Sequence, residues 1–340
     1  MEKPLCPYFG ACGGCRYQHL SYEEELALKE EALRRIFREE IGLDGGTIQT
    51  IVPSPAPYFY RSRLDLTLGR IRGVVRLGLN QEGAKDLIPI QSCAIARVEI
   101  SDFIPTLEKL ASARLPENYR GANIVVKTGD NGEVRWGGIG KGSLRMSEPD
   151  YFWTEIEGKR IHYSLDTFFQ ANLAILPVLM KEIRRALGPY PEMNLLDLYA
   201  GVGLFWVVLA SEVNRVWAVE DNPWAVRAAE FNRRYHGLSN VLLRQGRTED
   251  LLTPILKELE GKPQAAVVDP PRSGLSPTSL QKLTQAKTLD PLIYVSCHPP
   301  SLLRDLRGFL KSGWTVDQVT PIDFFPRTQH LETIVRLRSQ

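Results

Sequence analysis

The stretch at residues 195–205, LLDLYAGVGLF, constrains the fold of this chain more than any other feature of the sequence. Apolar residues lead to Asp197, a short turn carries Gly201 and Gly203, and apolar residues then resume with helix-compatible spacing. This pattern predicts a strand, a tight turn and a helix. Glycines in such a turn let a ligand approach the backbone, and the helix N-terminus supplies free N–H groups. The sequence therefore predicts a nucleoside site at this turn.

A second β-like run, VWAVEDNPWAV, follows this helix and contains Glu220 and Asp221 at its end. A doubly wound α/β fold places the carboxylate that holds a ribose diol at this point. The turn lacks the third glycine of a dinucleotide fingerprint, so a cofactor without a pyrophosphate fits better. Together the two segments resemble the S-adenosylmethionine pocket of Rossmann-like methyltransferases. An ordinary connection between a strand and a helix is the alternative.

The size and charge of the chain limit its organisation and its partners. A chain of 340 residues exceeds what one core usually organises, which predicts two domains. Its 42 Lys and Arg nearly balance its 40 Asp and Glu, so an anionic partner would meet a local patch. No apolar run approaches the roughly 18 residues of a membrane helix, and the amino end lacks the apolar core of a signal peptide. We therefore expect a cytoplasmic protein.

The five cysteines divide into a group of four and a single residue. Cys6, Cys12 and Cys15 share a glycine-containing loop, Cys93 is distant, and Cys297 stands alone. A disulfide framework fits poorly in a large chain without a signal peptide. Three thiolates at these spacings can converge on one centre with Cys93 as the fourth ligand, which suits zinc or a [4Fe–4S] cluster. The spacing does not choose between the two, and unliganded buried thiols are the alternative.

The order of patterns along the chain predicts two unequal parts. Residues 1–20 and 45–165 predict a β-rich RNA-binding domain that carries the cysteine site, and residues 166–340 predict a Rossmann-like domain. Residues 21–44 predict an amphipathic helix that packs on the catalytic domain and has a charged, solvated face. Five arginines near three aromatic residues suit contacts to RNA, with a merely soluble strand face as the equal alternative. These arginines are Arg61, Arg63, Arg70, Arg72 and Arg76.

The segment that crosses into the second part reads HYSLDTFFQAN. We expect Phe168 and Phe169 to lie in the core. Gln170 is expected at the start of a helix that runs to about residue 187.

Two later apolar runs end at reactive side chains, Asp269 in DPPR and Cys297 in SCHPP. The carboxyl ends of parallel strands meet at one edge of a sheet. A thiol facing a methyl donor, with the carboxylate of Glu332 in the same half, suggests covalent activation of a poor carbon nucleophile such as pyrimidine C5. Thiolate addition at C6 makes an enolate whose C5 attacks the sulfonium methyl. A base then removes the C5 proton so that the thiol can leave.

As a set, these motifs resemble the RNA 5-methyluridine methyltransferases, specifically the iron–sulfur members that modify 23S ribosomal RNA. The resemblance rests on C-x5-C-x2-C with Cys93, DTFFQAN, LLDLYAGVGLF with VEDN, DPPR, YVSCHPPSL and DFFPRTQHLET. It implies methylation of uridine C5 in RNA with S-adenosylmethionine, with Cys297 as nucleophile and Glu332 as proton acceptor. It implies a [4Fe–4S] cluster on Cys6, Cys12, Cys15 and Cys93. It also implies a cofactor and target-base site lined by Gln170, Tyr199, Gly201, Gly203, Glu220 and Asp269.

The sequence departs from this family pattern at three places. Leu204 stands where a polar residue often follows the second glycine, and Arg247 stands where an amide can contact the adenine. The chain begins at the cysteine cluster, so we expect it to lack the amino-terminal TRAM, or OB-like, domain of many members. Substrate choice is therefore the least constrained property.

Several other functions compete with this interpretation. They are a tRNA T-loop uridine methyltransferase, an exocyclic-amine methyltransferase, a cytosine-C5 enzyme and a non-catalytic RNA-binding protein. The last requires Cys297 and Glu332 to be purely structural. For the uridine enzyme we expect a monomer that takes a loop uridine flipped out of its stack, because unstacking costs least in loops.

Overall fold

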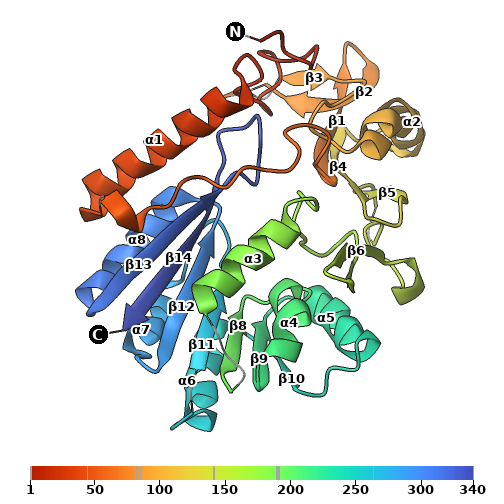
Figure 1. The fold of residues 1–340 in the computed structure, drawn as a ribbon. Helices are drawn as coiled ribbons and strands as arrows, with labels where there is room; N and C mark the ends of the chain where they lie inside the picture. The colour runs from red at the N-terminus through yellow and green to blue at the C-terminus, as the bar shows by residue number, and fades with distance from the viewer. Residues whose placement is uncertain are drawn as a thin grey trace.

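The computed structural model describes residues 2–43, 45–81, 83–84, 86–140, 142–188, 192–262 and 264–339. Its larger sheet has seven strands in the order β10-β9-β8-β11-β12-β14-β13 (Figure 1). Strands β8 to β12 are parallel, whereas β14 is antiparallel to both β12 and β13. The strands are β8 (Asn194–Leu198), β9 (Arg215–Glu220), β10 (Val241–Gln245), β11 (Gln264–Val268), β12 (Leu289–Ser296), β13 (Trp314–Ile322) and β14 (Glu332–Ser339). The strand order reverses between β8 and β11, which is where doubly wound folds bind their ligands.

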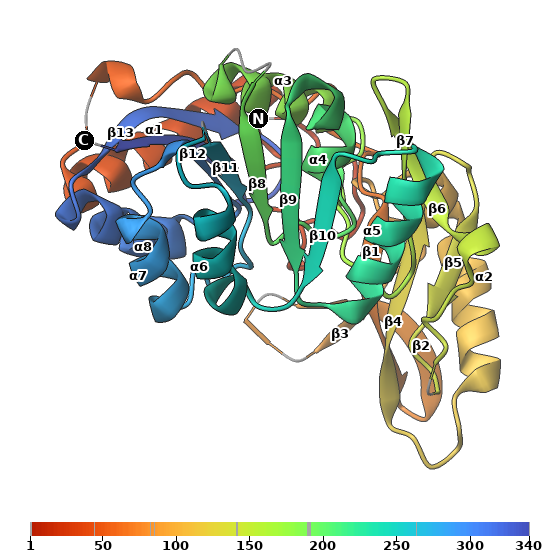
Figure 2. The ribbon, with the colours of Figure 1, turned by 90° about the horizontal axis from the view of Figure 1, so that it is seen from below.

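Helices cover both faces of this sheet, with α3 and α4 on one side and α6, α7 and α8 on the other (Figure 2). Each face of the sheet has its own hydrophobic core: the first core lies on the side of α3 and α4, and the second lies on the side of α6, α7 and α8. Successive strand residues alternate between these cores, so Leu195 packs in the first and Leu196 in the second, as the pleat requires. The first core also contains α5. The helices are α3 (Leu176–Leu187), α4 (Leu204–Leu209), α5 (Pro223–Tyr235), α6 (Thr248–Glu258), α7 (Pro277–Gln285) and α8 (Pro299–Lys311), with a 3-10 turn η3 (Ala210–Glu212) after α4.

Helix α1 (Tyr22–Ile41) lies on the second face of the large sheet. Ser21 and Glu24 form a capping box at its start, and Gly42 ends it in a left-handed conformation with φ of 66°. Leu33 and Phe37 are buried in the same core as α8. After the 3-10 turn η1 (Gly45–Thr47), the chain runs parallel to the edge strand β13. Among the described residues, no helix is both long and apolar enough to cross a membrane.

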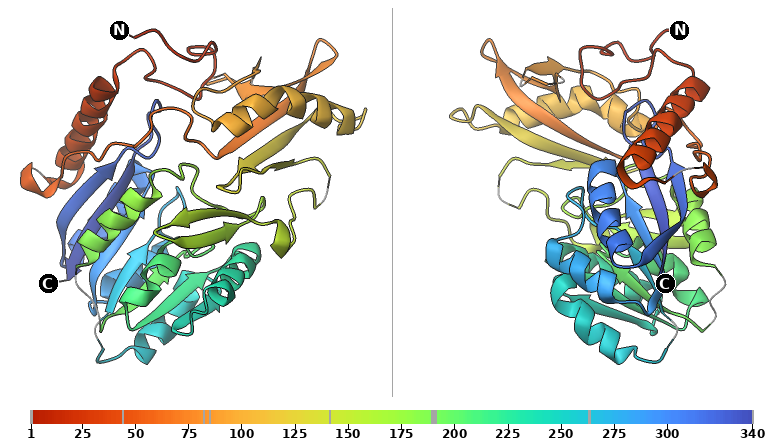
Figure 3. Two further views of the ribbon diagram at one scale, coloured as in Figure 1. Left: turned by 45° about the vertical axis from the view of Figure 1, so that its right-hand side comes forward. Right: turned by 90° about the vertical axis from the view of Figure 1, so that its left-hand side faces the viewer.

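The smaller sheet is antiparallel, with the strand order β3-β2-β1-β4-β5, and it lies apart from the larger sheet (Figure 3). Its core also contains α2, whose Ile100, Ile104 and Leu107 are buried against the strands. The elements are β1 (Arg63–Ile71), β2 (Val74–Asn80), β3 (Leu87–Pro89), α2 (Val98–Arg114), β4 (Gly121–Thr128) and β5 (Val134–Gly137).

A separate hairpin of β6 (Phe152–Ile156) and β7 (Lys159–Tyr163) follows the 3-10 turn η2 (Glu148–Asp150). Its buried residues belong to the first core of the seven-stranded sheet. The buried Asn232 of α5 binds it by accepting the His162 N–H at 2.8 Å and donating to the His162 carbonyl at 2.9 Å. The span 45–165 predicted as the β-rich domain thus includes a hairpin that shares the core of the larger sheet.

The segment between this hairpin and α3 differs from the sequence prediction. The helix expected to start at Gln170 begins only at Leu176, with Pro177 in its first turn, although it ends at Leu187 as predicted. Phe169 is 5% exposed and stacks on Tyr163, but Phe168 is 66% exposed, so its predicted place in the core was wrong. Tertiary contacts hold residues 164–175 as a loop.

Candidate active site

The turn after β8 combines a buried carboxylate with three left-handed backbone positions. Asp197 is fully buried, and it accepts the Trp206 N–H at 3.2 Å. Tyr199, Gly201 and Gly203 have φ of 64°, 54° and 108°. A Cβ on Gly201 would meet no atom within 4 Å, whereas one on Gly203 would lie 2.3 Å from the Trp206 ring. Gly201 therefore faces open space that a ligand can enter, and Gly203 allows Trp206 to pack.

This contrast predicts different effects for two alanine substitutions in the same turn. Gly203→Ala forces the Trp206 ring to move and should destabilise the protein by roughly 1–3 kcal/mol, as overpacking does. Gly201→Ala is the control and should cost only about 1 kcal/mol, because its Cβ meets nothing and only the backbone is strained. Urea unfolding of both variants measures the difference. Equal losses would show that the Trp206 contact is unimportant.

A cavity of about 390 Å³ opens beside this turn at the carboxyl ends of the strands. Tyr199, Glu220 and Arg247 are among its lining residues. Of the other residues predicted for this site, Gln170, Gly201, Gly203 and Asp269 do not belong to the lining formed by the described residues. The Glu220 carboxylate accepts the N–H groups of Gly201 and Asn222, both at 2.8 Å, and burial raises its pKa. A fixed carboxylate at a strand end suits a ribose diol, so the cavity fits the nucleoside part of S-adenosylmethionine.

Two of the three departures noted in the sequence fall at and beside this cavity. Leu204 is buried at the start of α4 and offers no polar side chain to a ligand. Arg247 is exposed at the cavity and forms an ion pair with Glu249.

Cys297 and Glu332 are brought together by the pairing of β12 with β14. The antiparallel register pairs Ser296 with Thr333, so its continuation by one residue brings Cys297 opposite Glu332. Burial raises the pKa of the Cys297 thiol to about 12, with the nearby Glu332 and Asp269 adding to the shift and Arg272 opposing it. Glu332 is 4% exposed, and burial, aided by Asp269, raises its pKa well above its ordinary value. A carboxyl group with a raised pKa thus lies near a thiol, where β12 ends and β14 begins.

Asp269 follows β11 and joins this group from the neighbouring strand. Its N–H donates to the Leu198 carbonyl at 3.3 Å, and burial raises its pKa to about 7. Three reactive side chains therefore come from the adjacent strands β11, β12 and β14, as the strand-end argument predicts for Asp269 and Cys297.

The raised pKa of Asp269 predicts a pH-dependent stability change on substitution. The ordinary pKa of an aspartate is about 3.9, so its contribution to stability is fully present below that pH and lost as the pH rises through about 7. Asp269→Asn removes the buried charge, and it should raise the melting temperature by about 3 °C or more at pH 8 and by less at pH 5. Thermal unfolding at the two pH values measures this. An equal change at both would contradict the raised pKa.

The loop at residues 164–175 carries Gln170 to the boundary between the two sheets. Gln170 is buried, and the Ser62 N–H donates to the next carbonyl, that of Ala171, at 2.7 Å. The buried Lys127 ammonium donates to the Ser164 carbonyl at 3.0 Å and also to the Thr167 carbonyl. Phe168 is left exposed two residues before Gln170, where an aromatic ring offers a stacking surface for an unpaired base. No sequence signal separates Phe168 from the buried Phe169.

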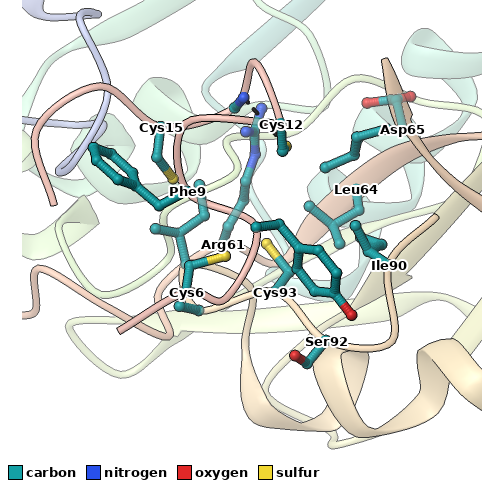
Figure 4. A pocket seen from close by; sticks show the side chains of 15 residues that line it. Cys6, Phe9, Cys12, Cys15, Arg61, Leu64, Asp65, Ile90, Ser92 and Cys93 are labelled. Carbon is teal, nitrogen blue, oxygen red and sulfur yellow. Dashed lines mark hydrogen bonds between the residues drawn. The ribbon is translucent and has the colours of Figure 1, made fainter. Parts of the chain in front are cut away.

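The four cysteines expected as ligands line one cavity of about 170 Å³ (Figure 4). Burial raises the pKa of Cys12, of Cys93 and, to about 12, of Cys15, and at least one neighbouring thiol of the group adds to each shift. Arg61 also lines this cavity. Within the described part of the chain, no group of three or more His, Cys, Asp or Glu side chains is arranged so that it could hold a metal ion. The structure brings the four thiols to one cavity but does not display a preformed metal centre.

Three of the other four arginines proposed for RNA contact have protein partners of their own. Arg63 pairs with Asp65 at 2.7 Å, and Arg76 pairs with Glu108 at 3.2 Å. The Arg70 side chain donates to the Tyr119 carbonyl at 3.2 Å. Arg72 lies in the turn between β1 and β2 with φ of 48°.

Comparisons with known proteins show what this chain is similar to in sequence and in fold. A sequence model of the family described as tRNA (Uracil-5-)-methyltransferase matches residues 146–340. An uncharacterised RNA methyltransferase of Caldanaerobacter subterraneus subsp. tengcongensis is 29% identical over 98% of this chain and 84% of its own length. The tRNA (uracil(54)-C(5))-methyltransferase of Schizosaccharomyces pombe is 28% identical, over 98% of this chain and 65% of its own.

A solved structure has the same fold. The crystal structure of the Pyrococcus abyssi tRNA (uracil-54, C5)-methyltransferase with S-adenosyl-L-homocysteine superimposes with a TM-score of 0.73 and 20% identity. The similarity covers 96% of this chain and 86% of that one. Since the family match spans more than half of the sequence, this chain belongs to the tRNA (uracil-5-)-methyltransferase family and is an RNA uracil-C5 methyltransferase.

Proposed function

We propose that the enzyme methylates uridine C5 through a covalent bond between the Cys297 sulfur and C6 of the base. The observation that supports this chemistry is the position of Cys297 opposite Glu332, with Asp269 on the adjacent strand end. A pyrimidine C5 is a weak nucleophile, and a thiol near a methyl-donor cavity is the group that can activate it.

The proposed reaction forms and breaks bonds in a fixed order. The Cys297 thiol passes its proton to the nearby Asp269 carboxylate and its sulfur adds to C6, while the C5=C6 electron pair moves toward O4 to give an enolate. C5 then attacks the methyl group of the donor, and S-adenosylhomocysteine leaves with the electron pair of the broken S–C bond. Glu332 takes the C5 proton, the C5–H electrons restore the C5=C6 bond, and the thiolate departs. The raised pKa of Glu332 makes it a stronger base for this last step.

Asp269 is proposed to recognise the uracil ring through a hydrogen bond. Its pKa of about 7 lets the carboxyl accept a hydrogen bond from the ring N–H when it is ionised and donate one when it is protonated. Tyr199, Gly201 and Glu220 are proposed to hold the nucleoside part of the donor, and Gln170 is proposed to lie against the donor and the base. Gly203 is also proposed to line the donor site, through its backbone, while its lack of a Cβ lets Trp206 pack beside it.

We propose that Cys6, Cys12, Cys15 and Cys93 hold a [4Fe–4S] cluster. The proposal is supported by the four thiols that line one cavity, because four thiolates are the usual ligands of such a cluster. When bound, the cluster supplies iron–thiolate bonds that tie the amino-terminal segment to the smaller sheet. Zinc is the alternative for the same donor set.

Metal analysis of the purified protein tests the cluster. Protein purified without oxygen should contain about four irons per chain and absorb near 400 nm, and Cys93→Ser should lose most of both, because one of the four ligands is removed. Cys297→Ser is the control and should keep its iron. One zinc per chain would replace the cluster proposal with a zinc site.

The target is proposed to be a loop uridine in folded RNA. The motif set resembles enzymes that modify 23S ribosomal RNA, while the printed names of the fission yeast and Pyrococcus abyssi relatives favour position 54 of tRNA. Mass spectrometry of nucleosides from separated ribosomal RNA and tRNA, with and without the active gene, distinguishes the two. Loss of 5-methyluridine from 23S RNA alone supports the first target, and loss from tRNA alone supports the second. If neither RNA loses 5-methyluridine, the proposed function is wrong.

A further inference from the structure

Four charged side chains are buried where α1 meets the loop between β13 and β14. They are Glu25, Lys29, Asp323 and Arg327, each no more than 5% exposed, and we name them the α1 clamp. The Lys29 Nζ atom lies 2.7 Å from a carboxylate oxygen of Glu25 and 2.7 Å from one of Asp323. The Arg327 guanidinium lies 3.5 Å from the other Glu25 oxygen. Two positive and two negative charges thus balance inside the protein.

The α1 clamp holds the loop through its backbone as well as its charges. The Arg327 N–H donates to Glu25 at 2.7 Å, and Lys29 also donates to the Phe325 carbonyl at 3.2 Å. The Tyr22 hydroxyl donates to Asp323 at 2.9 Å. Arg327 has φ of 65°, a left-handed conformation that non-glycine residues adopt only when their surroundings enforce it. Figure 1 shows the loop rising from β13 and β14 toward α1 and the amino-terminal segment.

The same loop is bound to the segment that follows the cysteines. The Arg327 carbonyl accepts the N–H groups of Arg16 at 2.7 Å and Tyr17 at 3.2 Å. The Arg327 side chain donates to the Leu20 carbonyl at 2.9 Å, and the Tyr60 hydroxyl donates to the Pro326 carbonyl at 2.9 Å. The loop is therefore held from two directions.

The β13–β14 loop ends at Glu332, the proposed proton acceptor. Glu332 is the first residue of β14 and pairs with Ile322, the last residue of β13. Asp323 follows Ile322 directly, and Arg327 lies five residues before Glu332. The clamped residues Asp323 and Arg327 therefore lie in the loop that joins Ile322 to its strand partner Glu332.

Stability alone does not explain four buried charges. Removing charges from water costs several kcal/mol per ion, and buried ion pairs often contribute no more to stability than apolar residues of the same volume would. Their use is to fix one geometry, because displacing any member leaves another charge unpaired.

We propose that the α1 clamp is a positioning device for Glu332. It holds the β13–β14 loop so that the carboxylate can reach the C5 proton after methyl transfer. The proposal rests on the proposed adduct chemistry, in which proton removal is a separate, last step. Loosening the α1 clamp should slow that step and leave donor binding and methyl transfer intact, so the methylated covalent adduct should accumulate.

The test uses full-length protein and total RNA from cells that lack the enzyme, labelled with tritium at uridine C5. Three quantities are measured: methyl groups transferred, tritium released to water, and RNA–protein adduct that survives denaturing electrophoresis. The variant is Glu25→Gln, which keeps the side-chain shape but removes the charge that pairs with Lys29 and Arg327. The matched control is Glu30→Gln, which removes the charge of an ion pair with Arg34 on the same helix without touching the loop.

The expected result is a tenfold or larger fall in tritium release for Glu25→Gln, with an unchanged Kd for the donor, measured by calorimetry. Methyl groups transferred should exceed tritium released, and an adduct should appear. Glu30→Gln should match the wild type. If methyl transfer and tritium release stay equal and no adduct appears, the α1 clamp does not position Glu332, whether or not the total rate falls.

A second variant covers the case in which Glu25→Gln does not fold. Arg327→Lys keeps the positive charge but changes the guanidinium contacts, and the same excess of methyl transfer over tritium release is expected. A ratio of one in this variant overturns the proposal. A separate control tests the adduct chemistry on which the proposal rests. If that chemistry is wrong, the wild-type enzyme forms no adduct with RNA containing 5-fluorouridine that survives denaturing electrophoresis.

Discussion

Replacement of Cys297 by alanine is expected to reduce methylation by about 10⁴-fold or more, because without the thiol no enolate forms at C5. The measurement is transfer of labelled methyl groups to total RNA from cells that lack the enzyme. The affinity for S-adenosylmethionine, measured by calorimetry, is the control and should not change, because the donor cavity is lined by other residues.

A trapping experiment tests whether the activity is lost because the covalent adduct can no longer form. With RNA that contains 5-fluorouridine, C5 carries no proton for the base to remove, so the wild-type enzyme should stop as a covalent adduct. Cys297→Ala should form none. An alanine variant that still methylates within tenfold of the wild-type rate would contradict the covalent mechanism, and an adduct attached elsewhere would show that the nucleophile is another residue.

Replacement of Glu332 by glutamine is expected to slow turnover by about 10²–10⁴-fold while the first turnover still transfers a methyl group. The amide keeps the shape of the side chain but cannot take the C5 proton, so the methylated base should remain bound to Cys297. Denaturing electrophoresis and mass spectrometry of the linked peptide and nucleotide measure this product. Its mass should include the added methyl group.

A shorter carboxylate provides the control for Glu332. Glu332→Asp retains a base at a greater distance, so it should turn over faster than Glu332→Gln and accumulate less adduct. Normal turnover of the glutamine variant would show that another group removes the proton. Loss of both methyl transfer and adduct would assign Glu332 to an earlier step.

The doubly wound half of the fold was predictable because its strands are short apolar runs followed by turns and helices. The same reasoning failed at residues 164–175. There an apolar sequence suggested an early helix start, whereas Lys127 and Asn172 hold the segment as a loop through contacts with distant parts of the chain. The adjacent residues Phe168 and Phe169 have opposite exposures, and that difference depends on those contacts rather than on local sequence.

The rule that parallel strands end at one side of a sheet predicted that Cys297 and Asp269 come together. The place of Glu332 could not be predicted in this way, because it depends on the register of the antiparallel strand β14. The α1 clamp was missed. Glu25 and Lys29 are four residues apart on a charged helix, a spacing that usually marks a surface pair, so the prediction placed them on a solvated face and was wrong. Their true partners, Asp323 and Arg327, are some 300 residues away in the sequence, and only the structure brings them together.

The placement of β14 between β12 and β13 gives the proposed chemistry a structural basis that differs from that of substrate choice. Main-chain pairing aligns the strand ends that carry the proposed nucleophile and the proposed proton acceptor, and that pairing does not depend on the side chains of the outer loops. We therefore expect sequence changes in the smaller sheet and around the exposed Phe168 to alter which RNA is accepted and to leave the proposed reaction unchanged.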